Sequence, residues 1–511
     1  MTHIFLYGPP GTGKSTIGRT LARDLALPFL DLDHVIESNA GMSISQIMDQ
    51  QGETAFRDLE TAALKHIATE KESVIALGGG ALLREENRLM AGIHGTVVLL
   101  MGELDTLLAH VQDDPAKRPL QAGDVRAKLN SLLARRREHY SSFVTQLYVD
   151  KKTSKQNAWE IQNILGRFHL AAMGEYDVLV QKVEQVGQLL SERLLQNPII
   201  VTDDRVVQLH AQSVLTSLRR AGFTPKIITA PAGEAHKNLN TLQQLWHEFL
   251  EAGLDRKSTV IALGGGVIGD LAGFAASTYM RGIPWVGMPT TLLAMVDASL
   301  GGKTGFDLPE GKNLIGSFYP PQLVLADPQV LKTLPEREFI SGLAEVVKHG
   351  IVADPELFNL CARGLDCVKA ELERIVTGGM AVKLKIIEED PYEKGFRAAL
   401  NLGHTVGHAV ELVSRFQLRH GEAVAIGMVA EARLAERLGT ANLGLSEMIG
   451  RVLSGLGLPT QIPKELSRME IIRAMRVDKK KNAKAIRFAL PVEIGKVELV
   501  DVANLEVVLD G

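Results

Sequence analysis

Apolar runs of strand length alternate with segments of helical periodicity from Ile4 to about Leu325. This alternation is typical of parallel sheets covered by helices. From Leu331 to about Leu458 the pattern is nearly all helical, and one pair of strand-like runs, 485–490 and 497–500, follows it. The chain is therefore predicted to have an α/β fold that ends in a mostly helical region.

The 511 residues suggest about three domains at roughly 150 residues each. A polar stretch at 151–157, an expected amphipathic helix from Trp159 to Phe168 and a new strand-like run at Tyr176 place the first boundary near residues 169–176. We predict a P-loop domain at 1–168, a linker at 169–175, an α/β nucleotide-binding domain at 176–327 and a mostly helical metal-binding domain at 328–511. The hexapeptide IALGGG occurs at 75–80 and 261–266, but its flanks differ, which favours convergence on one turn over duplication.

The composition is that of an ordinary globular protein, for which small-molecule chemistry is the default expectation. A net charge of -4 gives no electrostatic reason to expect nucleic acid or an anionic membrane as partner. No leader precedes the first strand and no apolar stretch reaches the roughly 18 residues that span a bilayer, so we expect a cytoplasmic protein. Cys361 and Cys367 are the two cysteines, too few for a disulfide framework, and we interpret them as packing thiols rather than a redox pair.

The sharpest motif is GPPGTGKS at residues 8–15, between an apolar strand at 3–7 and a helical pattern. Strand, glycine-rich turn and helix in this order form a P-loop, whose backbone N–H groups surround a phosphate chain. Lys14 supplies a positive charge to the outer phosphates, and the Ser15 hydroxyl can bind Mg²⁺. The predicted ATP contacts are Gly11, Thr12, Gly13, Lys14, Ser15 and Thr16.

Asp31 and Asp33 end the second strand-like run, and strand alternation would place both carboxylates on one side, near the P-loop. Either could hold magnesium or accept a proton. Further polar motifs follow at GETAFR (52–57), GGG (78–80), RPL (118–120) and Arg136, four residues before Tyr140. Together with the P-loop, these spacings resemble shikimate kinases over nearly all of residues 1–168.

That resemblance implies a role for each matching residue. Asp33 would contact shikimate hydroxyls and help to deprotonate the attacking one, while Asp31 would lie near Mg²⁺. Arg57 and Arg136 would hold the substrate carboxylate, because a planar guanidinium binds carboxylates with two parallel hydrogen bonds. Two further groups complete the implied site: the backbone turn of Gly78, Gly79 and Gly80 against the substrate ring, and the lid residue Arg118, which would contact ATP and stabilise the transferring phosphoryl group.

A second glycine-rich motif, GGGVIGD at 264–270, follows the strand-like run 259–263 and opens a helical pattern. It contains G-x-G-x-x-G, which alone is a weak indication of nucleotide binding. The acidic residue that an ordinary dinucleotide-binding unit offers to ribose about 20 positions later is missing. A nucleotide site is expected here, but an ordinary Rossmann dehydrogenase is not.

Metal-binding residue types gather in the helical region. His404 and His408 lie four apart, on one face of a predicted helix, and His420 and Glu345 add two further candidate ligands. Three histidines within seventeen positions and a glutamate favour a divalent metal site with an open coordination position. Spacing alone nominates His404 and His408 as the paired ligands.

The segments 289–297, 301–304 and 311–319, with the glycine-rich and histidine motifs, resemble 3-dehydroquinate synthase from about residue 176 to the end. The whole chain thus resembles a fusion of shikimate kinase with this synthase. The resemblance implies a reaction in which bound NAD oxidises a ring hydroxyl of a sugar-acid phosphate, phosphate leaves, and the hydride returns before the carbocycle closes. It also implies a homodimer, because Arg281 matches an arginine that reaches into the neighbouring subunit's site.

For the metal, the resemblance overrides the spacing argument: it implies zinc, or another divalent ion, on Glu345, His404 and His420, with His408 as a substrate contact. Catalytic roles are implied for Asp297, Lys303, Lys348 and His408. Substrate contacts are implied for Arg281, Lys303, Lys312, Asn313, Lys348, Lys383, Arg397, Asn401 and one or both of Lys479 and Lys480. The implied NAD contacts are Asp203, Glu234, Lys237, Gly265, Gly266, Asp270, Thr290, Thr291, Lys303 and Lys312.

One departure from the synthase pattern is Asp307, which adds a negative charge close to a site for anions. Two alternatives therefore stay open. One is a different sugar-phosphate cyclase fused to a small-molecule kinase. The other is a chain in which one half serves as a regulatory or scaffolding module, although both sets of site residues are present.

Overall fold

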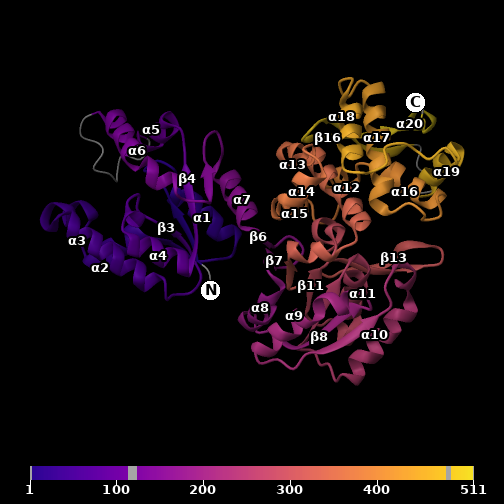
Figure 1. Ribbon diagram of the computed structural model, residues 1–511, viewed down its shortest axis with the longest axis horizontal. Coiled ribbons are helices and arrows are strands. Elements are labelled where there is room, and N and C mark those ends of the chain that lie inside the picture. Colours follow the sequence, from indigo (N-terminus) through magenta and orange to yellow (C-terminus); the bar gives the residue numbers. More distant parts are fainter. Residues whose placement is uncertain (1–2, 113–123, 479–484, 510–511) are drawn as a thin grey trace. The chain divides into compact units, whose positions relative to one another are not determined.

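The computed structural model describes residues 3–112, 124–478 and 485–509. The chain divides into two compact units, Met1–His169 and Leu170–Gly511 (Figure 1). The division falls within strand β6 (Arg167–Leu170). Leu170–Gly511 contains both the predicted α/β domain, 176–327, and the predicted helical domain, 328–511, in one compact unit.

The first unit has a five-stranded parallel sheet in the order β2-β3-β1-β4-β5. Along β1, Phe5 and Tyr7 face one apolar core and Ile4 and Leu6 face another, so the central strand is buried on both sides. Helices therefore cover both faces of this sheet, as expected for parallel strands. The strands are β1 (His3–Tyr7), β2 (Phe29–Asp31), β3 (Val74–Ala76), β4 (Gly95–Met101) and β5 (Gln146–Tyr148). The helices are α1 (Lys14–Asp24), α2 (Leu32–Ala40), α3 (Ile44–Ile67), α4 (Glu85–His94), α5 (Leu104–Gln112), α6 (Val125–Ser141) and α7 (Ser154–Leu165).

The last helix of this unit differs from the expected Trp159–Phe168. Helix α7 begins at Ser154, because Thr153 and Gln156 form a reciprocal capping box, and it ends before Gly166, which has a left-handed conformation. Phe168 consequently lies in strand β6, not in a helix.

The strands that lie wholly in the second unit form a parallel sheet in the order β7-β14-β11-β10-β8-β9. These strands are β7 (Tyr176–Val180), β8 (Gln196–Asp203), β9 (Lys226–Ala230), β10 (Ser258–Gly264), β11 (Trp285–Pro289) and β14 (Leu323–Ala326), with helices α8 (Val186–Glu192), α9 (Val206–Arg220), α10 (Leu239–Glu251) and α11 (Gly266–Thr278). An antiparallel ribbon of β12 (Lys303–Leu308) and β13 (Gly311–Phe318) follows β11 in the chain.

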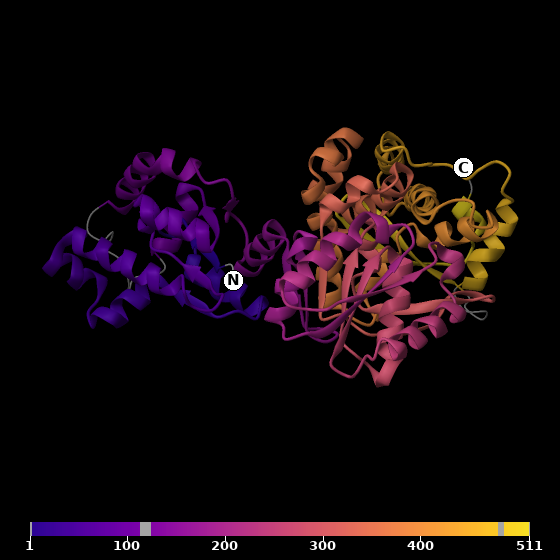
Figure 2. The ribbon, with the colours of Figure 1, turned by 60° about the horizontal axis from the view of Figure 1, so that its bottom comes forward.

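The orange and yellow helices of Figures 1 and 2 form the rest of this unit, beside its magenta α/β part. They are α12 (Glu336–Ala353), α13 (Pro355–Cys361), α14 (Leu365–Ala370), α15 (Leu372–Glu389), α16 (His404–Val413), α17 (His420–Arg437), α18 (Leu445–Gly455), α19 (Arg468–Asp478) and α20 (Glu506–Leu509). The expected late strand pair is present as β15 (Ile486–Glu493) and β16 (Lys496–Val502), which are antiparallel. The predicted fold class, α/β followed by a mostly helical region, is confirmed.

Helix α12 carries Glu345, one of the candidate metal ligands. Its residues from Phe339 to Val352 are buried with one exception, so it is covered on all sides rather than along one stripe. Glu345 is fully buried in this helix. Across the described ranges, no helix combines the length and the apolar character needed to cross a bilayer.

Candidate active sites

The first candidate site is the loop between β1 and α1. Gly8, Gly11 and Gly13 have φ values of 145°, 85° and 76°, which only glycine adopts without strain, and these turns shape the loop. Lys14 begins α1 and is buried, and its Nζ donates to the carbonyl oxygens of Gly8 (2.9 Å) and Pro9 (3.0 Å). Thr12 is also buried, whereas Thr16 is exposed. The ammonium therefore lies inside the loop that would hold phosphates.

Asp31 and Asp33 do not lie on the same strand. Strand β2 ends at Asp31, which caps helix α2 by accepting from the backbone N of Asp33 at 3.2 Å. The alternation argument is therefore wrong, because Asp33 lies in the first turn of a helix. Asp31 nevertheless reaches the P-loop, where its Oδ2 accepts from the Ser15 hydroxyl at 2.7 Å. Hydroxyl and carboxylate oxygens are ligands that suit Mg²⁺.

The glycines at 78–80 bring the other polar residues of this unit together. A Cβ at Gly78 would lie 2.9 Å from Asp33 Oδ1, and one at Gly80 would lie 2.6 Å from Arg57 Nη2. The carbonyl of Gly79 accepts from Arg136 Nη1 at 2.5 Å. Asp33, Arg57 and Arg136 thus converge on one turn of three glycines, and a side chain at Gly78 or Gly80 would collide with them.

Sequence reasoning missed Glu60, which is fully buried beside this turn. Its Oε2 accepts from Arg57 Nη1 at 2.7 Å. Burial raises the pKa of Glu60, although the Arg57 guanidinium opposes the shift. The i, i+3 spacing from Arg57 was the available signal. Arg118, the predicted lid arginine, lies outside the described residues.

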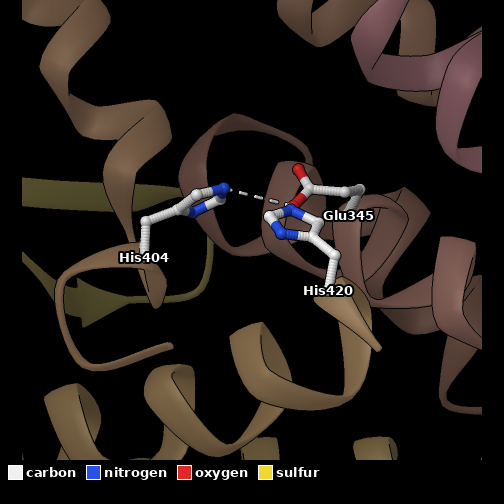
Figure 3. Close-up of side chains that lie close together, drawn as sticks. All are labelled: Glu345, His404 and His420. Atoms are coloured by element: carbon white, nitrogen blue, oxygen red, sulfur yellow. Dashed lines mark ion pairs between the residues drawn. The ribbon is translucent and has the colours of Figure 1, made fainter. Parts of the chain in front are cut away.

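The second candidate site lies where three helices meet. Glu345 comes from the middle of α12, His404 is the first residue of α16 and His420 the first of α17. Each imidazole Nε2 lies 3.5 Å from Glu345 Oε1, and the three side chains point toward one another (Figure 3). Ligand atoms of these three residues lie within 4.8 Å of one another, a distance that one metal ion can bridge. His408 is exposed and does not belong to this group, although its ring centroid is 5.1 Å from that of His404.

Hydrogen-bond partners aim both imidazoles toward this centre. His404 Nδ1 lies 3.1 Å from the Leu402 carbonyl oxygen, and His420 Nδ1 lies 3.5 Å from Glu411 Oε2. Each Nε2 is therefore left to face Glu345, an arrangement typical of metal-binding histidines. Burial opposes protonation of His420, but the carboxylates of Glu345 and Glu411 raise its pKa to about 9. Two imidazoles and a carboxylate fit zinc or another divalent ion with an open position.

Buried charges surround the triad. Lys348, one turn after Glu345 on α12, forms an ion pair with it. Lys383 Nζ donates to Asp297 Oδ1 at 2.6 Å, and Asp297 lies in a π-helical turn, Ala294–Ala298. Burial lowers the pKa of Lys383. Desolvation opposes ionisation of the partly buried Asp297, but the adjacent Lys383 ammonium holds the pKa of this carboxyl well below its usual value. Such perturbed groups in π-helical turns are common at functional sites.

A small glycine-lined pocket lies at the end of β10. Added Cβ atoms at Gly265 and Gly266 would lie 3.1 Å from Thr291 Cγ2 and 3.3 Å from Ala298 Cβ, so a side chain at either position would crowd the lining of the pocket. The pocket is lined by residues that include Gly264, Gly265, Gly266, Asp270, Pro289 and Lys303. The lining thus includes both the glycine motif and Lys303, at the start of the β12–β13 ribbon. This backbone cradle at the start of α11 fits a dinucleotide pyrophosphate.

Lys237 is buried at the edge of this pocket. Its Nζ lies 2.7 Å from Asp270 Oδ2 and donates to Asn313 Oδ1 at 2.6 Å. Burial raises the pKa of Asp270 to about 6, with Lys237 opposing the shift. Asp307, the departure noted in the sequence, lies 3.9 Å from Lys237 Nζ and accepts from the backbone N of Asn313 at 2.8 Å. The negative charge of Asp307 is therefore partly balanced by the Lys237 ammonium and by the backbone N–H of Asn313.

Two acidic residues that the sequence did not single out contact the predicted anion-binding residues. Glu393 accepts from Lys303 Nζ at 3.1 Å and from Asn401 Nδ2 at 2.9 Å. Glu411 accepts from Lys312 Nζ at 3.0 Å while its other oxygen faces His420. Lys312 also lies 3.4 Å from Glu234. Arg397 is buried and donates to the Pro391 carbonyl.

The remaining predicted residues divide by position. Thr290 is buried after β11, and Asp203, at the end of β8, accepts from the backbone N of Arg205 and Val206 at 2.9 Å each. Arg281 is exposed, on a turn where Met280 and Arg281 have positive φ values of 49° and 69°. Lys479 and Lys480 lie outside the described residues.

Three family models match the chain: shikimate kinase at residues 10–166, the N-terminal part of 3-dehydroquinate synthase at 227–341 and its C-terminal part at 342–481. The 3-dehydroquinate synthase of Nostoc punctiforme is 46% identical over 335 residues, which are 64% of this chain and 92% of that protein. These residues account for the second unit. The two units thus match two different enzyme families.

Two solved structures of cyclising synthases resemble the second unit. A 2-deoxy-scyllo-inosose synthase complexed with carbaglucose-6-phosphate, NAD⁺ and Co²⁺ is 26% identical, covers 68% of this chain and 100% of its own, and has a TM-score of 0.62. A 2-epi-5-epi-valiolone synthase from Streptomyces hygroscopicus with NAD⁺ and Zn²⁺ bound is 29% identical, covers 65% of this chain and 94% of its own, and has a TM-score of 0.61.

Proposed function

The chain belongs to the 3-dehydroquinate synthase family and carries a shikimate kinase unit at its N-terminal end, and from this we propose that it catalyses both reactions at separate sites. The first is ATP-dependent phosphorylation of shikimate to shikimate 3-phosphate. The second is conversion of 3-deoxy-D-arabino-heptulosonate 7-phosphate to 3-dehydroquinate with release of phosphate. The observation that carries the proposal is that, among the described residues, each compact unit brings together the candidate site residues of one of the two enzyme families.

In the kinase unit, the turn at Gly78–Gly80 is where shikimate would bind. Arg57 and Arg136 would hold its carboxylate, and Asp33 would accept the proton of the attacking hydroxyl. Mg²⁺ bound with ATP would neutralise phosphate charge beside Ser15 and Asp31. Lys14 would leave the loop carbonyls to stabilise the transferring phosphoryl group. Its ammonium would then donate to an anionic phosphate instead of to two neutral carbonyl oxygens.

In the synthase unit, Glu345, His404 and His420 would hold zinc or another divalent ion, and the pocket after β10 would hold NAD. When bound, these two groups supply polarisation of the substrate hydroxyl and reversible acceptance of a hydride. Lys348, His408 and the Asp297–Lys383 pair would move protons around the ring. Lys303, Lys312, Asn313, Arg397 and Asn401 would orient the carboxylate and phosphate of the substrate. Glu393 and Glu411, which neutralise two of these lysines, would have to yield to that anionic substrate.

A substrate comparison on the intact protein tests this proposal against the other cyclases. We expect phosphate release from 3-deoxy-D-arabino-heptulosonate 7-phosphate, with 3-dehydroquinate identified by mass spectrometry, to exceed release from glucose 6-phosphate by at least about a hundredfold. A site built to pair with a carboxylate loses charged hydrogen bonds when the substrate lacks that group. Faster turnover of the sugar phosphate without a carboxylate would instead assign this unit to the other cyclases.

We also propose a homodimer in which Arg281 completes the synthase site of the partner. Consecutive non-glycine residues with positive φ are strained, and strain of this kind is retained at functional positions. Beside this turn, Tyr319 donates to the Ile283 carbonyl at 3.0 Å, and the adjoining β13 exposes Leu314, Ile315 and Phe318. An exposed apolar group next to an exposed arginine suits a two-fold contact.

Mixing two inactive variants tests the shared site. Arg281→Ala and Glu345→Ala proteins should each lack synthase activity, because one loses a substrate contact and the other a metal ligand. After subunit exchange, one site of each hybrid dimer has both residues intact. We expect recovery toward about a quarter of wild-type activity for random pairing. If fluorescence transfer demonstrates exchange but activity stays absent, Arg281 does not act across the interface.

A further inference from the structure

Helix α16, whose first residue is His404, begins without a capping side chain of its own. The residue before it, Gly403, has a left-handed conformation with φ of 78° and offers no side chain. The first backbone N–H groups of a helix have no partner within it, so they must bond elsewhere. The start of this helix is where one of the proposed metal ligands is attached, and its exact placement therefore matters for the triad.

Glu431 from α17 supplies the missing acceptors. Its Oε2 accepts from the backbone N of Gly403 at 2.6 Å, and its Oε1 lies 3.3 Å from the backbone N of Val406. The side chain is fully buried, so its charge depends on these donors and on the positive end of the helix dipole. A buried carboxylate costs solvation free energy, which makes a purely packing role a poor explanation.

The two helices also approach unusually closely at this point. A Cβ at Gly403 would lie 2.6 Å from Met428 Cγ and 2.7 Å from the Val424 carbonyl oxygen, and one at Gly407 would lie 3.0 Å from the Ala423 carbonyl oxygen. Helix α17 begins at His420, the other proposed imidazole ligand. Glu431 therefore connects the start of the His404 helix to the helix that carries His420.

We infer that Glu431 is a positioning residue for the metal triad: by capping α16 from α17, it fixes His404 relative to His420 before metal binds. The inference rests on the proposed function, since it assigns Glu431 a role toward the ion held by Glu345, His404 and His420. Groups that hydrogen-bond metal ligands directly set metal affinity, and their loss costs about 10- to 100-fold. Glu431 acts through the backbone of the His404 helix, so we expect an effect at the lower end of that range.

The chain provides a matched control on the same helix. Glu436, also on α17, accepts from the backbone N and the hydroxyl of Ser446 at 2.8 Å each, and so caps α18 as Glu431 caps α16. Helix α18 carries none of the three proposed ligands. Glu436→Gln thus removes the same kind of charge from the same helix without affecting the His404 helix.

The test measures zinc affinity by competition with a chromophoric chelator on full-length wild-type, Glu431→Gln, Glu431→Ala and Glu436→Gln proteins. We expect Glu431→Gln to weaken zinc binding about tenfold or more and Glu436→Gln to leave it within about twofold. Glu431→Gln keeps the shape of the side chain, so it remains informative if the alanine variant does not fold. Shikimate kinase activity of the same preparations reports that the first unit is intact, and the thermal unfolding curve of each variant reports whether the second unit is folded.

Unchanged zinc affinity in folded Glu431→Gln, or an equal loss in Glu436→Gln, would overturn the inference. If the proposed metal site itself were wrong, the result would be different. Wild-type protein would then bind no zinc, or the His420→Ala protein would bind zinc as tightly as wild-type protein does.

Discussion

Replacing Lys14 by alanine is expected to lower shikimate phosphorylation by at least about a hundredfold while leaving synthase turnover unchanged. The buried ammonium is held inside the phosphate loop, 2.9 Å from the Gly8 carbonyl oxygen, so it needs little reorganisation to reach a bound phosphate. Loss of one preorganised charge contact to a transition state typically costs about 3 kcal/mol. The measurement is the rate of ADP formation that depends on shikimate.

Lys65→Ala is the control for this prediction, because Lys65 is an exposed lysine of the same unit whose ammonium lies 3.9 Å from Glu86, outside the set of candidate site residues. It should retain the wild-type rate. Phosphorylation near the wild-type rate in Lys14→Ala would remove the P-loop from the mechanism and with it the assignment of this unit.

Replacing His420 by alanine is expected to abolish stoichiometric zinc binding and to lower the synthase rate by several orders of magnitude. Its Nε2 is 3.5 Å from Glu345 Oε1, and its removal leaves two of three ligands. His408→Ala should keep zinc yet lose turnover, since His408 lies outside the group of converging ligand atoms. Zinc content after dialysis and the rate of phosphate release separate the two variants.

The opposite pattern, with zinc lost in His408→Ala and kept in His420→Ala, would restore the interpretation that i, i+4 spacing alone favoured. That spacing is real: both residues lie on α16. The structure shows why it is insufficient, because His408 is exposed while Glu345 and His420 approach His404 from two other helices.

Short-range features were predictable from the sequence. Strand, glycine turn and helix at residues 3–24 follow one another directly, so the P-loop needs no tertiary information. The correct bounds of α7 were also accessible, since Thr153 and Gln156 form a capping box and Gly166 has the left-handed conformation that ends helices. The placement of Asp33 was wrong because a cap at Asp31 ended the strand earlier than alternation implied.

Long-range features were not predictable from residues alone. Glu345 lies 59 positions before His404, and the packing of α12 and α16 against α17 brings their atoms within 4.8 Å. Resemblance to a family supplied this triad, whereas periodicity could not. Glu60, Glu393, Glu411 and Glu431 were missed because a glutamate on a helix or loop is usually a solvated charge, and their partners lie elsewhere in the fold.

The central claim is that one chain holds two separate catalysts. Its most direct test measures both rates, shikimate-dependent ADP formation and phosphate release from 3-deoxy-D-arabino-heptulosonate 7-phosphate, in wild-type, Lys14→Ala and His420→Ala proteins. The account predicts both activities in wild-type protein, loss of only the first in Lys14→Ala and loss of only the second in His420→Ala. A wild-type chain with only one of the two activities, or a single substitution that removes both from a folded protein, would contradict it.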